Sequence, residues 1–155
     1  MIVATLAVIP QGEKVLLGEK KKGKIGIGVL SGPGGVLEPG ETFRACLIRE
    51  TREELEIELD PTSLELVGVI DFYHAEKIDF RVIIYRAQIL SGELHETDDM
   101  IPDWYPLSDE TFARTYEADR FWLPKAARGE RFRAKVYYRE RARGFERIEF
   151  MPFPK

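Results

Sequence analysis

A glycine-rich segment followed by an uninterrupted helical pattern constrains this chain more than any other feature. Residues 31–40 read SGPGGVLEPG, with four glycines and two prolines. This composition predicts a loop with demanding backbone geometry and no regular structure. The next segment, Thr42 to Glu56, contains no glycine or proline and carries apolar residues at helical spacings. Thr42 is a suitable N-cap, so the sequence predicts a loop that leads directly into a helix.

Three glutamates lie on one stripe of the predicted helix. Glu50, Glu53 and Glu54 have i, i+3 and i+4 spacing, which confines them to an arc of about 100°. Like charges at this spacing repel and weaken a helix, so something must offset the repulsion. Carboxylate oxygens are ligands of hard divalent cations such as Mg²⁺. The alternative is an ordinary solvated face, which is what most glutamate-rich helices present.

Groups in and beside the loop could complete such a site. Gly34 and Gly35 allow backbone carbonyls and amides to approach a ligand closely, so a carbonyl there could join the glutamates. Arg49 can reach Glu53 at i+4. Glu41, at the junction of loop and helix, could pair with Arg49 and hold the two pieces together.

The remaining sequence predicts one α+β domain that spans residues 1–155. The chain has 155 residues, 44% of them hydrophobic and 32% charged, which suits one domain with its own core. Strands mixed with a few helices do not fit a doubly wound sheet. We predict strands at 2–9, from 14, at 64–74 and at 80–90, an acidic loop at 91–103, a short extended piece at 104–107, a helix at 119–128 and a terminal hairpin from 131 to 150.

Charge and cysteine content narrow the functional classes. The net charge of -4 argues against general binding to nucleic-acid backbones, although a nucleotide held through a divalent cation remains possible. The longest apolar run, Met1 to Ile9, is far shorter than the ~20 residues of a membrane helix. The single cysteine, Cys46, excludes an intrachain disulfide. We therefore expect a cytoplasmic protein without a membrane or nucleic-acid partner, and the sequence leaves monomer or homodimer open.

The segment from Gly35 to Ile57 resembles the Nudix box, G-x5-E-x7-R-E-U-x-E-E-x-G-U, in which U is aliphatic. Two positions depart from the box: Thr51 replaces an aliphatic residue, and Glu56 replaces the glycine that usually closes the helix. The segments 15–23, 28–35, 96–104 and 119–124 are similar to the branch that hydrolyses oxidised purine nucleoside triphosphates such as 8-oxo-dGTP. The matching box positions are Gly35, Glu41, Arg49, Glu50, Glu53, Glu54 and Ile57.

The resemblance implies a fold, a metal and a reaction. The fold would be the Nudix α/β/α sandwich with a central mixed sheet. The metal would be Mg²⁺, with Mn²⁺ as a possible substitute, and water would attack a phosphorus of a small nucleotide. The glutamate that serves as general base stays open, and Asp99 could equally belong to a solvated acidic loop. The implied catalytic residues are Arg49, Glu50, Glu53 and Glu54, and the implied metal ligands are Gly34, Glu50, Glu53, Glu54 and Asp99.

The resemblance also implies a base pocket, where this chain departs from the branch. Ser31 replaces an asparagine that reads the purine edge, and Tyr116 replaces a stacking tryptophan. Asp119 is the remaining member of an aspartate pair, because Ala118 occupies the other position. The substrate could therefore be another nucleotide or nucleoside-diphosphate derivative, and a non-catalytic nucleotide-binding module is a further alternative. Lys20 could be an ordinary surface lysine. The implied substrate-binding residues are Thr5, Lys20, Ser31, Gly34, Gly35, Tyr116 and Asp119.

Overall fold

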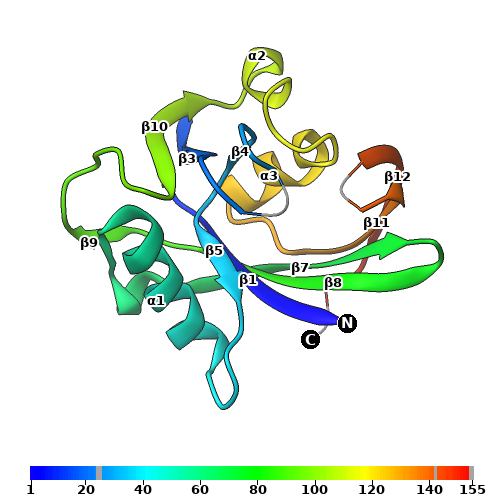
Figure 1. Ribbon diagram of the computed structural model, residues 1–155, viewed down its shortest axis with the longest axis horizontal. Coiled ribbons are helices and arrows are strands. Elements are labelled where there is room, and N and C mark those ends of the chain that lie inside the picture. The colour runs from blue at the N-terminus through cyan, green and yellow to red at the C-terminus, as the bar shows by residue number, and fades with distance from the viewer. Residues whose placement is uncertain (24–25, 142, 154–155) are drawn as a thin grey trace.

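A mixed six-stranded sheet forms the centre of the computed structural model, which describes residues 1–23, 26–141 and 143–153 (Figure 1). The strand order is β12-β11-β7-β8-β1-β5. β1 runs parallel to β8 and β11 runs parallel to β7, while the other neighbours are antiparallel. The strands are β1 (Ile2–Val8), β5 (Gly34–Val36), β7 (Glu65–His74), β8 (Lys77–Arg86), β11 (Phe132–Glu140) and β12 (Arg143–Met151).

Two smaller sheets and a few helices complete the fold. β10 (Met100–Pro106), β3 (Lys14–Lys20) and β2 (Pro10–Gln11) form one sheet, with β4 (Leu30–Ser31) paired to β3. β6 (Glu58–Leu59) pairs with β9 (Ile89–Ser91). The helices are α1 (Phe43–Leu55), α2 (Asp109–Phe112), α3 (Asp119–Ala127) and the short 3-10 helix η1 (Pro61–Ser63). None of the helices in the described ranges is long and apolar enough to cross a bilayer.

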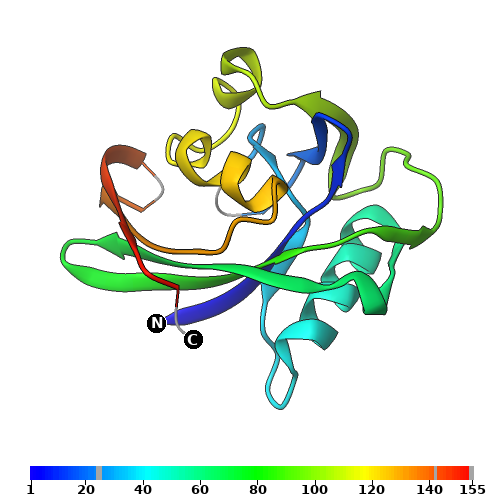
Figure 2. The same ribbon diagram turned by 180° about the vertical axis from the view of Figure 1, so that it is seen from behind.

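The central sheet lies between two helical layers. α1 packs against β1 and β5 on one side, and α3 packs against β8 and β1 on the other, as the two views show (Figures 1 and 2). The hydrophobic core has two parts, one on each side of the central sheet. Successive side chains of β8 point into different parts, because side chains alternate between the two faces of a strand. Ile84 joins the core beside α3, whereas Ile83 and Tyr85 join the core beside α1. The predicted α/β/α sandwich is therefore confirmed.

The predicted elements agree with the structure except at three segments. Residues 31–40 were expected to contain no regular structure, yet Gly34–Val36 forms β5. The reason is the missing Cβ: at Gly34 it would lie 2.0 Å from the Thr5 carbonyl oxygen, so glycine lets this strand pair closely with β1. The predicted strand 80–90 ends at Arg86, and Ile89 begins β9. The predicted acidic loop 91–103 ends early, since β10 starts at Met100.

Candidate active site

The start and the rotation of α1 are set by its own sequence. The side chain of Thr42 accepts a hydrogen bond from the Ala45 N–H at 3.1 Å, which confirms the predicted N-cap. Cys46, Leu47, Thr51 and Leu55 form the buried side of the helix. Thr51 is fully buried and its hydroxyl has no hydrogen-bond partner among the residues that the structure describes, so its surroundings are those of an apolar side chain. Burial of this side turns the glutamate stripe (Glu50, Glu53 and Glu54) away from the core.

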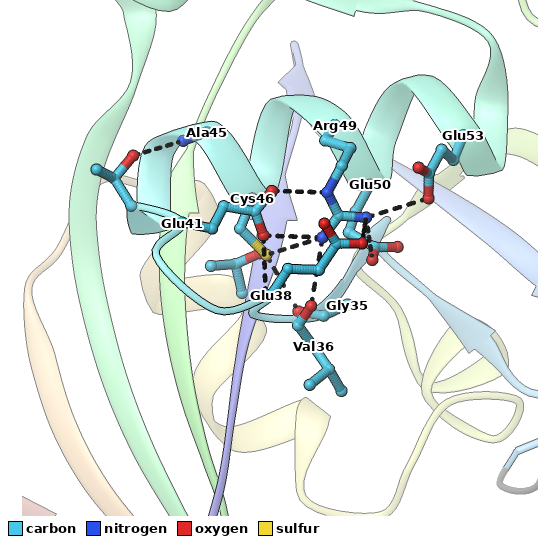
Figure 3. Close-up of polar contacts among 11 residues, drawn as sticks. Gly35, Val36, Glu38, Glu41, Ala45, Cys46, Arg49, Glu50 and Glu53 are labelled. Atoms are coloured by element: carbon cyan, nitrogen blue, oxygen red, sulfur yellow. Dashed lines mark hydrogen bonds and ion pairs between the residues drawn. The ribbon is translucent and has the colours of Figure 1, made fainter.

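Arg49 is the cation that offsets the repulsion within this acidic region (Figure 3). Its Nε and Nη2 donate to the two oxygens of Glu41 at 2.6 and 2.9 Å. Its Nη1 lies 2.8 Å from Glu50 and 3.2 Å from Glu53. The predicted Glu41–Arg49 pair is confirmed, and the guanidinium lowers the pKa of Glu41 to about 2. The helix and the loop before it are thus joined by one side chain.

Glycines bring two carboxylates of the stripe, those of Glu50 and Glu54, against the loop. The Gly34 N–H donates to Glu54 at 2.8 Å. A Cβ at Gly35 would lie 2.3 Å from the Glu50 carboxyl carbon, so only glycine leaves room for that group. Burial raises the pKa of Glu54 to about 7, against the hydrogen bond from Gly34, and burial also raises the pKa of Glu50. Desolvated carboxyls of this kind ionise more readily when a cation approaches them.

The oxygen atoms of the loop and of the glutamate stripe are suitable ligands for a hard divalent cation. Gly34, Glu50 and Glu54 lie together, and all of them offer oxygen, the donor that Mg²⁺ prefers. Glu53 and Asp99 line a neighbouring polar cleft of about 510 Å³. Within the described residues, no three acidic, histidine or cysteine side chains converge on one point. In this structure Arg49 engages Glu50 and Glu53, and Lys22 lies 3.1 Å from Asp99.

The loop that carries Asp99 is held beside the glutamate stripe by hydrogen bonds. The Thr97 hydroxyl donates to the Glu54 carbonyl oxygen at 2.5 Å. Lys21 Nζ donates to Glu96 at 2.6 Å and to the Thr97 carbonyl oxygen at 3.0 Å. These contacts tie the loop to the end of α1 and to the end of β3. Sequence reasoning missed Lys21, Glu96 and Thr97 because no spacing rule connects three residues that meet only through the fold.

Glu56 closes α1 although the Nudix box has glycine there. Its backbone adopts φ 56° and ψ 36°, and its N–H donates to the Arg52 carbonyl oxygen at 2.9 Å. This left-handed conformation is costly for a residue with a Cβ. The Glu56 carboxylate lies 2.6 Å from His95 Nε2, which adds a contact between the helix end and the following loop. The turn therefore forms despite the departure from the box.

Replacing Glu56 with glycine is expected to stabilise the protein. Glycine removes the left-handed strain, worth about 1 kcal/mol, while the lost pair with His95 is exposed and worth less. We expect the free energy of unfolding to rise by about 0.5–1 kcal/mol, measured by urea denaturation. Glu56→Ala is the matched control, because it loses the same pair and keeps the strain. Equal stability of the two variants would contradict the assignment of strain.

An apolar cavity of about 230 Å³ lies between the central sheet and α3. Four of the predicted substrate-binding residues meet there: Lys20, Ser31, Tyr116 and Asp119. Thr5 does not join them. Its side chain is 2% exposed and its hydroxyl lies 3.3 Å from Cys46 Sγ of α1, so it faces the other side of β1. The next residue, Leu6, lines the cavity instead, as strand alternation requires.

Asp119 supplies a carboxyl group in the wall of this cavity. The residue is 7% exposed and accepts a hydrogen bond from Trp122 Nε1 at 3.1 Å. Burial raises its pKa to about 7, so near neutral pH the group is present in both its neutral and its charged form. A neutral carboxyl donates one hydrogen bond and accepts others. The cavity therefore combines apolar walls with one group able to recognise a donor or an acceptor.

The stability of the protein should fall as pH rises, because of Asp119. The folded-state pKa of about 7 exceeds the ordinary value of 3.8, so the folded protein retains a proton that the unfolded chain releases. The stabilisation is complete below the ordinary value and is lost as pH rises toward the folded-state value. Asp119→Asn should therefore gain stability relative to wild type from about pH 4 to about pH 8, by at most about 4 kcal/mol. Urea denaturation across this range measures the difference.

Comparison with known proteins gives the family. Residues 1–126 match the family model of the NUDIX domain. The chain is 34% identical to an oxidized purine nucleoside triphosphate hydrolase of Danio rerio over 83% of this chain and 81% of that protein. It is 33% identical to the Mus musculus protein of the same description, over the same shares. An NAD-capped RNA hydrolase NudC of Pseudomonas putida is 31% identical over 67% of this chain and 36% of its own length.

A solved structure shares the fold over nearly the full length. The MutT protein of Bacillus halodurans superimposes with a TM-score of 0.76, 19% identity and coverage of 99% of this chain and 100% of that chain. This likeness agrees with the sandwich described above. The sequence resemblance and the arrangement of the box residues on α1 point the same way. The chain belongs to the Nudix family.

Proposed function

We propose that this protein is a Mg²⁺-dependent nucleoside triphosphate diphosphatase of the cytoplasm. It would convert oxidised purine nucleotides such as 8-oxo-dGTP to the monophosphate and diphosphate, and so clear them from the nucleotide pool. The observation that carries the proposal is the position of Glu50 and Glu54, two desolvated carboxyls held against Gly34 and Gly35. The likeness to two oxidized purine nucleoside triphosphate hydrolases supports the choice of substrate.

The acidic residues of the site would bind the metal and accept a proton from the attacking water. Glu50, Glu53, Glu54, Asp99 and the carbonyl of Gly34 would hold the metal. Mg²⁺ held there would offset negative charge on the phosphoanhydride oxygens and would make the attacking water more acidic. One of the three glutamates of the stripe takes the proton from the attacking water.

The other charged and glycine residues position these groups. Arg49 holds Glu41, Glu50 and Glu53 in place through ion-paired contacts to each of them. Lys20 brings positive charge to the phosphate side of the cavity it lines, and Gly34 and Gly35 leave room for the phosphates.

The apolar cavity would receive the base. Tyr116 supplies an aromatic wall, and Ser31 and Asp119 supply polar groups. Since Asp119 has a pKa of about 7, its neutral form can donate to a base oxygen or nitrogen. A site that hydrogen-bonds its substrate rejects analogues that lack the partner group. Ser31 offers a shorter and simpler group than an amide, so the base preference of this chain is best measured against several substrates.

A substrate panel tests the proposal. Purified protein is incubated with 8-oxo-dGTP, dGTP and ADP-ribose in Mg²⁺, and diphosphate and monophosphate are separated by chromatography. We expect 8-oxo-dGTP to be cleaved fastest, with cleavage abolished by a chelator and restored by Mg²⁺ or Mn²⁺. Equal rates on dGTP and 8-oxo-dGTP, or faster cleavage of ADP-ribose, would favour a different nucleotide substrate. Tight nucleotide binding without hydrolysis would identify a non-catalytic module.

A further inference from the structure

The apolar cavity has a second polar end that the residues named so far do not use. Asp79 and Arg141 line it where the β7–β8 hairpin meets the β11–β12 hairpin. Arg141 Nε donates to Asp79 Oδ2 at 2.7 Å, and Arg141 Nη2 donates to Asp79 Oδ1. The Asp79 side chain is 16% exposed. This pair lines one end of the cavity, where the Arg141 side chain is 50% exposed and its guanidinium is held in a fixed fork.

The guanidinium keeps donors available at that end. Its carbon lies 5.5 Å from the ring centroid of Phe80, another residue of the cavity wall. Asp79 takes two of the five N–H donors of Arg141. Within residues 1–23, 26–141 and 143–153, no other acceptor bonds to this guanidinium. Three N–H donors therefore remain for a ligand.

The spacing of the two polar ends suits a bicyclic base. Cavity-facing residues of β8 run from Ile84 to Phe80, a span of about 13 Å along the strand. Ile84 pairs with Leu6, and Leu6 and Asp119 line a common void, so Asp119 lies toward the Ile84 end. A purine with a hydrogen bond of about 3 Å at each end occupies a length of this order. A single-ring pyrimidine is too short to reach both ends.

We propose that Arg141 determines specificity by donating a hydrogen bond to an oxygen on the five-membered ring of an oxidised purine. Asp119 binds the opposite edge of the same base, and the inference rests on the proposed function. Oxidation at C8 replaces a C–H group with a carbonyl, which is an acceptor. An unmodified purine places a C–H at that position, so an Arg141 N–H directed there gains no hydrogen bond, and the side chain, 50% exposed in this structure, gives up water contacts without compensation when such a base enters. Arg141, oriented by its pair with Asp79, thus distinguishes a C8 carbonyl from a C8–H group.

The test compares nucleotide discrimination in matched variants. Arg141→Met removes the donors, and Arg141→Gln retains a neutral donor. Arg139→Met is the control, because Arg139 is an exposed residue of the same hairpin and does not line the cavity. The readouts are kcat/KM for 8-oxo-dGTP and dGTP, and the dissociation constants of the two monophosphates. We expect Arg141→Met to lower the 8-oxo-dGTP to dGTP ratio about tenfold, Arg141→Gln to lower it less, and Arg139→Met to leave it unchanged.

Two results would overturn this assignment. One is a folded Arg141→Met protein whose kcat/KM is unchanged for both nucleotides. The other is an equal loss on both nucleotides, which would make the pair with Asp79 a purely structural contact. The binding constants separate this inference from the proposed function, because they need no turnover. If wild type hydrolyses neither triphosphate, the proposed function fails, while a reduced preference of Arg141→Met for 8-oxo-dGMP over dGMP still supports the role of Arg141.

Discussion

Replacing Glu54 with glutamine is expected to lower kcat for 8-oxo-dGTP hydrolysis by about 10³-fold and to leave the fold intact. Glutamine keeps an oxygen that can accept the Gly34 N–H, now bonded at 2.8 Å. It removes the negative charge that would hold the metal, and it removes a possible acceptor for the proton of water. The measurement is diphosphate release at saturating nucleotide and Mg²⁺, with thermal unfolding of both proteins in parallel.

Glu110→Gln is the control for the Glu54 substitution. Glu110 is an exposed residue of α2, and its loss should change neither kcat nor the unfolding temperature. Full activity in Glu54→Gln would exclude Glu54 from the metal site. A large drop in unfolding temperature would instead show that the charge of Glu54 supports the fold.

Replacing Arg49 with methionine is expected to lower the free energy of unfolding by about 3 kcal/mol. The Arg49 side chain is 20% exposed and pairs with Glu41, whose side chain is 12% exposed. Without the guanidinium, Glu41, Glu50 and Glu53 remain close together and uncompensated, and their mutual repulsion is felt strongly because water is partly excluded. Urea denaturation at neutral pH measures the loss.

Magnesium should reverse part of the loss in Arg49→Met. A divalent cation that binds folded but not unfolded protein stabilises by mass action, and here it would also replace the missing positive charge. We expect millimolar MgCl₂ to stabilise Arg49→Met more than it stabilises wild type. Arg52→Met is the matched control on the same helix, since Arg52 forms one exposed pair with Glu58 and should cost less than about 1 kcal/mol. The role of Arg49 in offsetting the glutamate charges is excluded if Arg49→Met and Arg52→Met lose the same free energy of unfolding and are stabilised equally by MgCl₂.

Local signals made much of the fold predictable. The helix α1 combined an N-cap at Thr42, a run without glycine or proline, and a regular apolar face, and each agrees with the structure. The terminal hairpin was predictable from the alternation of its strands, but Gly144, where the turn was expected, lies within β12, and Arg143 already pairs with Glu140. β5 was not predictable in this way. Glycine normally weakens a strand, and the close approach of Gly34 to Thr5 appears only when both segments are placed in the sheet.

The acidic half of the site was easier to predict than the base cavity. The glutamate stripe lies on one helix, where residue spacing fixes the arrangement. The cavity wall draws Leu6 from β1, Phe72 from β7 and Phe80 from β8, and their meeting depends on strand register. Asp79 and Arg141 likewise come from two hairpins that are distant in sequence, so no local pattern indicates that they pair.

The interior position of β1 has a consequence for how the chain folds during synthesis. β1 lies between β5 and β8 and precedes both of them in the sequence, so Ala4 is synthesised well before Val82, its parallel partner in β8. Long-range parallel pairing of this kind is slow, because loop closure precedes any gain from contacts. One edge of segment 2–8 therefore stays open until β8 is synthesised, although β5 can pair with the other edge earlier, and an open apolar edge of this kind is a target for chaperones that shield such segments.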